Sequence, residues 1–445
     1  MHKSNFVLAF VPVYMTMVDT LKTLGANDDA IQRFTSTCAP RHLVSFGGAV
    51  TKQKELKDNY IEKALKHMNI IELREWFKDN IVLYIDSGGY QCGQGYVLKH
   101  EIPKFAEFYT RFLGDYYDYY DWAFSLDVPP NDVIFSSWDD VLRINEQTYK
   151  IVDQLPKHVK DKLIFVFHFR SPRIWDIWSK LALEFVNRYG NYWSVGGVAG
   201  FNVNNRMPCW LYTLPLVLFL NTFKLSTKPL YFHILGDFSW TTIFFSQLIP
   251  KAVKKFFGID LTITYDATSI VTGNLKYRYL WDQHEDGYVD KVLIRKTEKH
   301  KTSNGVSNLE RALNLLKDAA LAHDFPVLDV VDIDRDSSDS FIPEVASYVV
   351  MQSIHQYWRI EEWCDKVSEN LLDLYLDGKY DEFNVEVMNV LQKLHSGKLS
   401  KSIYTRRAYA TTTLQILQNL DMFRCENLLD MLQDEFMFRE EIPRW

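Results

Sequence analysis

Short apolar runs recur along the chain, and they are rich in β-branched and aromatic side chains. Because neither face of these runs is polar, they predict strands buried on both sides, as in parallel sheets. The runs are Phe6–Val13, Leu43–Phe46, Ile81–Ile85, Trp122–Leu126, Leu163–Phe167, Tyr192–Val195, Leu230–Leu235 and Leu261–Tyr265.

Segments with helical spacing separate most of these runs. Apolar residues three or four positions apart mark helices at 105–112, 141–151 and 243–248. Ser307 with Glu310 forms a capping box that opens a further helix. Strands that alternate with helices predict an α/β fold, a (β/α)8 TIM barrel with insertions. An open doubly wound sheet is the alternative, weakened because no GxGxxG follows the first strand.

The pattern becomes purely helical near the C-terminal end. Apolar residues with helical spacing fill 345–376, 382–394 and 411–436, and the polar run "DIDRDSSDS" at 332–340 resembles a linker. We therefore expect a barrel domain over residues 1–335 and a C-terminal α-helical domain over residues 341–445.

Composition narrows the class of protein. Hydrophobic residues make up 47% of the chain and charged residues 24%, which excludes wholesale disorder. The net charge of −7 argues against a protein that coats nucleic acid indiscriminately, because such binding depends on clusters of Lys and Arg. Local basic patches are still compatible with binding to a polyanion.

Cysteine spacing and hydropathy indicate a soluble cytoplasmic protein. No signal peptide is visible, and the longest apolar run, Leu211–Phe223, is shorter than the roughly 20 residues that cross a bilayer. The cysteines are far apart with no CxxC, which suits reduced thiols and gives no support for a cysteine-rich zinc site. They are Cys38, Cys92, Cys209, Cys364 and Cys425. We expect no metal, no cofactor and no membrane partner, and the oligomeric state stays open.

Acids and glycine pairs follow several of the predicted strands. "DSGGYQ" (86–91) follows the third, Asp127 the fourth, a glycine pair (196–197) ends the sixth and Asp266 ends the eighth. In a barrel these positions lie on the C-terminal face, where active sites form. A glycine pair is more often only a turn, and an Asp after a strand is commonly a helix cap. Their recurrence on successive strand ends favours a site with room for a flat, purine-like base.

The order of these motifs resembles the tRNA-guanine transglycosylase superfamily, whose members are (β/α)8 enzymes that exchange guanine for a 7-deazaguanine. The likeness covers roughly residues 5–325 and is most specific in "DSGGYQ" and "GGVAG" (196–200). It implies that Asp266 is the nucleophile that attacks C1′ and that Asp86 is the general acid/base. It also implies a base-binding set made of Asp127, Ser87, Gly88, Tyr90, Gln91, Gly196, Gly197, Leu235 and His168.

Two differences from the tRNA enzymes decide which branch of the superfamily the sequence resembles more. No CxCxxC follows the eighth strand, and the fifth strand ends in "FHFRS", where those enzymes place a base-reading Gln. Either His168 or Arg170 substitutes for that Gln, or His168 is a packed histidine. The sequence is more similar to the DNA-acting bacterial and phage branch, so we expect DNA and a free 7-deazaguanine as substrates. A tRNA enzyme without zinc, or an inactive barrel that binds nucleic acid or a base, is the alternative.

Two basic segments are candidates for phosphate contacts. The first is "KVLIRKTEKHK" (291–301), and the second, 398–409, interleaves basic and aromatic residues. A solvated basic surface explains either segment equally well. The residues in question are Lys291, Arg295, Lys296, Lys299, Lys301, Arg406 and Arg407.

Overall fold

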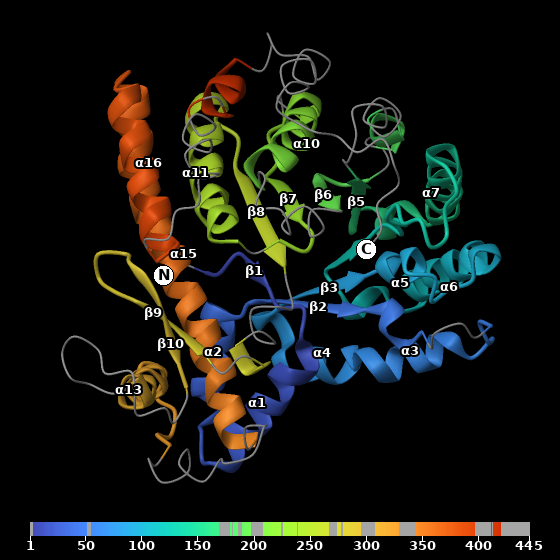
Figure 1. The fold of residues 1–445 in the computed structure, drawn as a ribbon. Helices are drawn as coiled ribbons and strands as arrows, with labels where there is room; N and C mark the ends of the chain where they lie inside the picture. The colour runs from blue at the N-terminus through green and yellow to red at the C-terminus, as the bar shows by residue number, and fades with distance from the viewer. Residues whose placement is uncertain are drawn as a thin grey trace. The chain divides into compact units, whose positions relative to one another are not determined.

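The computed structural model is a (β/α)8 barrel, as the alternation of apolar runs predicts (Figure 1). Eight strands form one sheet in the order β1-β8-β7-β6-β5-β4-β3-β2. The ladders from β3 to β8 are parallel, and a parallel bridge joins Leu8, next to β1, with His42 in β2. The structure describes residues 3–50, 55–168, 179, 181–185, 189–196, 208–223, 226–237, 239–266, 274–276, 279–294, 308–328, 343–396, 411 and 413–419.

The strands lie close to the predicted runs. They are β1 (Phe6–Val7), β2 (Arg41–Ser45), β3 (Val82–Asp86), β4 (Trp122–Phe124), β5 (Leu163–His168), β6 (Tyr192–Gly196), β7 (Leu230–Ile234) and β8 (Leu261–Asp266), with a separate antiparallel hairpin of β9 (Tyr279–Gln283) and β10 (Val289–Leu293). The helices are α1 (Val11–Thr23), α2 (Asp28–Cys38), α3 (Tyr60–Met68), α4 (Ile70–Phe77), α5 (Gly89–Gly93), α6 (Ile102–Asp115), α7 (Trp138–Val152), α8 (Lys157–Lys160), α10 (Pro208–Phe223), α11 (Trp240–Phe257), α13 (Asn308–Leu321), α15 (Pro343–Leu376) and α16 (Tyr380–Leu394).

The first predicted strand is wrong in its second half. β1 ends at Val7, and helix α1 begins at Val11. Pro12 sits in the first turn of α1, where a proline suits a helix because the amide there has no partner within the helix. A short apolar run cannot distinguish a strand from a buried helix, and Tyr14, Val18 and Leu21 are buried on one side of α1.

By their internal contacts the residues fall into two compact units. Unit 1 comprises Met1–His42, Phe238–Leu248 and Asp266–Ala408, and unit 2 comprises Leu43–Asp237, Ile249–Tyr265 and Tyr409–Trp445. Within unit 1, the long helix α15 packs on α1, α2, α13 and β9. The expected boundary between a barrel domain and a helical domain stays a prediction, and its linker at 332–340 lies outside the described residues.

Side chains on alternate positions of the unit 2 strands fill the barrel interior. Tyr84 contacts the rings of Tyr192 and His233, and the Thr264 hydroxyl lies 2.7 Å from the Tyr192 hydroxyl and 2.8 Å from His233 Nδ1. The intervening positions face the helices, as Phe165 does against Tyr149 on α7. The interior is therefore a packed core, as is usual for this fold, and in this protein aromatic rings form much of it.

No helix among the described residues combines the length and the apolar character needed to cross a bilayer.

Candidate functional site

The predicted acids lie at the C-terminal ends of barrel strands. Asp86 is the last residue of β3, two positions beyond the interior-facing Tyr84, and Asp266 is the last residue of β8, two positions beyond Thr264. Since side chains alternate along a strand, both acids occupy interior-facing positions of their strands. Asp266 is only 8% exposed. The parallel ladders place the C-terminal ends of β3 to β8 at one edge of the sheet.

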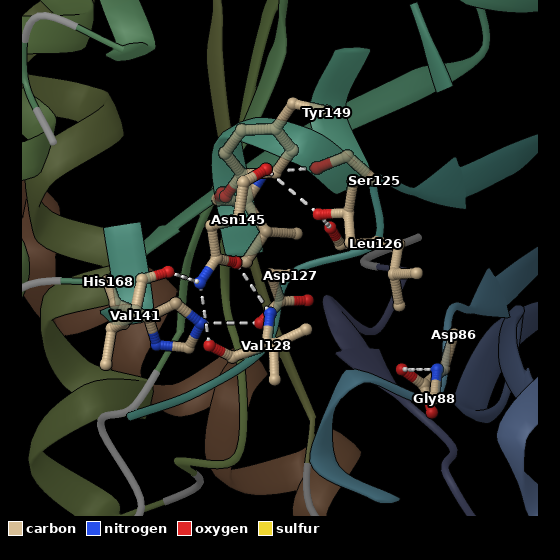
Figure 2. A network of polar contacts seen from close by, with 12 residues as sticks. Asp86, Gly88, Ser125, Leu126, Asp127, Val128, Val141, Asn145, Tyr149 and His168 are labelled. Carbon is tan, nitrogen blue, oxygen red and sulfur yellow. Dashed lines mark hydrogen bonds and ion pairs between the residues drawn. The ribbon is translucent and has the colours of Figure 1, made fainter. Parts of the chain in front are cut away.

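Asp127 and His168 form a buried pair at this edge (Figure 2). Asp127 follows β4, His168 ends β5, and Asp127 Oδ2 lies 2.5 Å from His168 Nε2. Both side chains are buried, at 10% and 3% exposure. Asp127 Oδ1 makes no hydrogen bond to any residue that the structure describes. The pair therefore leaves one carboxylate oxygen available as an acceptor, while His168 fixes the orientation of the other.

Helix α7 holds the segment that carries Asp127, which we name the Asp127 loop (Ser125–Val128). Asn145 accepts a hydrogen bond from the Val128 amide at 2.7 Å and donates one to the Val128 carbonyl at 3.0 Å. The Thr148 hydroxyl donates to the Leu126 carbonyl at 2.9 Å. Both side chains are fully buried. One hydrogen bond at Leu126 and two at Val128 thus fix the backbone on the two sides of Asp127 before any ligand binds.

Asp86 lies close to Asp127, because the turn after β3 packs against the Asp127 loop. A Cβ atom added to Gly89, three residues after Asp86, would meet the Asp127 carbonyl oxygen at 1.6 Å. The buried Cys92 thiol lies near both carboxylates. Burial raises its pKa most, and the charges of Asp127 and Asp86 raise it further. Two carboxylates in one region can divide the tasks of binding an N–H donor and carrying a proton.

The glycines that we assigned to a base-binding role have clear packing functions. Gly88 adopts φ +87°, and its Cβ would meet the Gly47 Cα at 2.4 Å. Gly196 pairs with His168 in the β5–β6 register, and its Cβ would meet the His168 ring at 2.6 Å. Packing alone thus requires these glycines, and their contact with a base stays a prediction. Gly197 lies outside the described residues.

The other base-binding candidates differ in their surroundings. Ser87 Oγ and Gln91 Oε1 are buried, and neither has a hydrogen-bond partner among the described residues. Tyr90 is 59% exposed on α5, so its ring is accessible for stacking. Leu235 is half-buried just after β7, and its amide donates to the Val195 carbonyl at 3.0 Å. Buried polar atoms without partners are rare in folded proteins and often mark a ligand site.

The basic candidates are only partly described. Lys291 lies in β10, and its Nζ is 3.6 Å from the centre of the Tyr279 ring, a cation–π contact within the hairpin. Its role in phosphate binding stays a prediction. The remaining candidates lie outside the described residues: Arg295, Lys296, Lys299, Lys301, Arg406 and Arg407.

Three polar residues near the strand ends had no role assigned from the sequence. Asp237 is fully buried just after β7, and it stands in the "ILGDF" run two residues beyond Leu235. Asn145 and Thr148 lie on the face of α7 that we read as apolar. A polar residue on an otherwise apolar helix face was the available signal, because a buried Asn needs several hydrogen bonds.

Comparisons with known proteins do not identify the chain. No protein-family model matches it, and a search of curated proteins finds no significant match. The assignment of function therefore depends on the motifs and on the geometry of the strand ends.

Proposed function

We propose that the protein is a glycosyltransferase that exchanges guanine in DNA for a 7-deazaguanine base, in the cytoplasm of a bacterial or phage-infected cell. The observation that carries this proposal is the fixed Asp127 carboxylate, which has one oxygen without a hydrogen-bond partner among the described residues and lies beside the segment that follows Asp86. A carboxylate in this state suits the N1–H and exocyclic amine of a guanine edge.

The reaction needs two further carboxyl functions. In the first half, the Asp266 carboxylate attacks C1′ of the target nucleotide, the bond from C1′ to guanine N9 breaks, and Asp86 donates a proton to the departing base. In the second half, Asp86 takes the proton from N9 of the incoming 7-deazaguanine, N9 attacks C1′, and the Asp266 carboxylate is released. Two inversions give retention at C1′, as in retaining glycosidases, and the balance requires no further reactant.

The target base must leave its stack to reach buried carboxylates. Enzymes that act on a base either rotate the nucleotide out of the duplex or accept single-stranded substrate. The exposed ring of Tyr90 offers a stacking surface for an extruded base.

A labelling experiment tests the proposal. The protein is incubated with radiolabelled guanine or a 7-deazaguanine and with either duplex DNA or tRNA, and the recovered polymer is counted. We expect label in DNA, and we expect Asp266→Asn to abolish it together with any denaturation-resistant protein–DNA adduct. Asp86→Asn is expected to stall exchange and to let the adduct accumulate.

The matched control is Asp260→Asn. Asp260 precedes the N-terminal end of the same strand β8, where it is exposed and paired with Lys254. Exchange should survive this change. Label in tRNA alone would reassign the polymer, and an adduct that persists in Asp266→Asn would refute the assigned nucleophile.

A further inference from the structure

A thiol and two imidazoles from distant parts of the sequence converge in unit 1. Cys38 ends α2, His323 follows α13, and His355 lies on α15. Cys38 Sγ is 3.9 Å from His323 Nε2, which is 2.9 Å from His355 Nδ1. All three atoms lie within 4.8 Å of one another. We name Cys38, His323 and His355 the Cys–His cluster.

These separations are close to those of ligands around one metal ion. With bonds of about 2.0–2.1 Å to nitrogen and 2.3 Å to sulfur, a tetrahedral zinc ion places its ligand atoms about 3.3–3.6 Å apart. Side-chain shifts of roughly half an ångström would bring the cluster to that geometry. The ligand types also suit zinc, which binds thiolate and imidazole in preference to oxygen.

From the convergence of these three atoms we propose that the Cys–His cluster is a binding site for a divalent transition metal, with Zn²⁺ as the preferred ion. Cys38 Sγ, His323 Nε2 and His355 Nδ1 are the ligands, and the fourth tetrahedral position is left for water or an added ligand. Binding converts the Cys38 thiol to a thiolate and releases one proton. The ion would tie the end of α2 to α15 and to the turn after α13.

The surroundings of the cluster suit a bound cation. Phe34 and Phe325 pack against the His323 ring and form an apolar shell, which strengthens metal–ligand attraction. Two acids lie near the cluster: Glu361 acts electrostatically on Cys38 and Asp324 on His323, although Asp324 is also paired with Arg33. Cys38 and His355 are buried and His323 is half-buried, so an ion can enter from the His323 side.

A purely structural cluster is the competing explanation. It would consist of one hydrogen bond between the two imidazoles and a thiol packed beside them. The two explanations differ in a measurable way, because only a metal site gives a thiolate bonded to an ion.

Cobalt provides the test, because a Co²⁺–thiolate bond absorbs in the near ultraviolet. The full-length protein is freed of metal, titrated with Co²⁺, and followed by absorption, with Zn²⁺ then added as a competitor. We expect one ion per chain, a thiolate charge-transfer band, and loss of the band when Zn²⁺ displaces Co²⁺. Cys38→Ala should abolish the band, and His323→Ala should weaken binding at least about tenfold.

Cys364→Ala is the matched control. Cys364 is also a fully buried free thiol in unit 1, but it is not part of the cluster. It should keep both the band and the stoichiometry. If Cys38→Ala does not fold by circular dichroism, His323→Ala decides, because His323 is only half-buried while Cys38 is fully buried. No thiolate band in the parent protein, or an unchanged band in a folded ligand variant, would overturn the proposal. The readout does not involve base exchange, so it stands or fails independently of the proposed activity.

Discussion

The Asp127 loop and the Cys–His cluster both gather polar groups in a buried place, but they are held in different ways. The loop is fixed by hydrogen bonds from Asn145 and Thr148 to its backbone, and Asp127 has His168 as a side-chain partner. Within the cluster, the described residues make a single imidazole–imidazole hydrogen bond and a longer thiol contact. A site that backbone contacts already fix can bind and release a ligand without changing shape. A cluster with few contacts of its own would instead be held together by a tightly bound ion.

The largest expected effect is a loss of base exchange that leaves the Cys–His cluster unaffected. Asp127→Asn puts an amide N–H in place of either the oxygen that pairs with His168 or the oxygen that has no hydrogen-bond partner among the described residues. A base edge would then face a mismatched donor. We expect base exchange to fall at least about a hundredfold, because buried polar groups without partners discriminate strongly. Co²⁺ binding should be unchanged.

Asp139→Asn is the control for this change, since Asp139 is an exposed acid in the first turn of α7. Exchange at the parent rate in Asp127→Asn would mean that Asp127 does not read the base.

A second effect, on stability and not on the rate of exchange, tests the rigidity of the Asp127 loop. Gly89→Ala would place a Cβ atom 1.6 Å from the Asp127 carbonyl oxygen, so the loop or α5 must move. We expect the free energy of unfolding to fall by at least about 3 kcal/mol, at the upper end of overpacking effects. Urea denaturation measures the change.

Gly114→Ala is the matched comparison, because a Cβ at Gly114 in α6 meets nothing within 4 Å. Alanine there should stabilise the protein by about 0.5–1 kcal/mol. Equal free energies of unfolding for the two variants would show that the Asp127 loop moves at little cost and is not rigid.

The smallest effect concerns pH and the chain segment that follows Cys38. Burial lowers the pKa of His42 from 6.5 to about 4, while its contact with the Ala39 carbonyl opposes that shift. Above pH 6.5 the ring is neutral in both the folded and unfolded states. As pH falls from 6.5 toward 4, the unfolded chain gains a proton that the folded chain does not, so stability falls by about 2–3 kcal/mol.

Urea denaturation of the metal-free protein at pH 7.5 and 4.5 measures this loss. Burial also lowers the pKa of His323 to about 4 and of His355 to about 3, so both contribute to the loss in the parent protein. His42→Gln should remove the His42 share alone. An identical pH dependence in parent and variant would contradict a neutral, buried His42.

The sequence predicts the barrel well because parallel strands buried on both faces are continuous apolar runs. The end of β3 at Asp86 and the end of β8 at Asp266 lie within one residue of the predicted ends. β1 was predicted too long, since Pro12 fits the first turn of a helix and the apolar run contains no other signal. The β9–β10 hairpin was missed, because its burial alternates irregularly and its basic residues suggested a surface segment.

The candidate sites were predictable to different degrees for a topological reason. Strand order brings Asp127 and His168 together, since β4 and β5 are neighbours in a parallel sheet. No regular element connects Cys38 with His323, which is 285 residues away, and no spacing rule for metal ligands covers such a distance. The isolated cysteines form no metal-binding motif in the sequence, which is why we expected no metal, but a fold can bring together ligands that no motif connects.

The aromatic core of the barrel has a kinetic consequence. Tyr84, Tyr192 and His233 pack across the inside of unit 2, so side chains fill the part of the interior that the described residues line. The incoming base therefore enters from the C-terminal ends of the strands, the same side from which the guanine leaves. On the proposed chemistry, guanine has to depart before its replacement enters, so velocity plots against the two substrates should give the parallel lines of a ping-pong sequence.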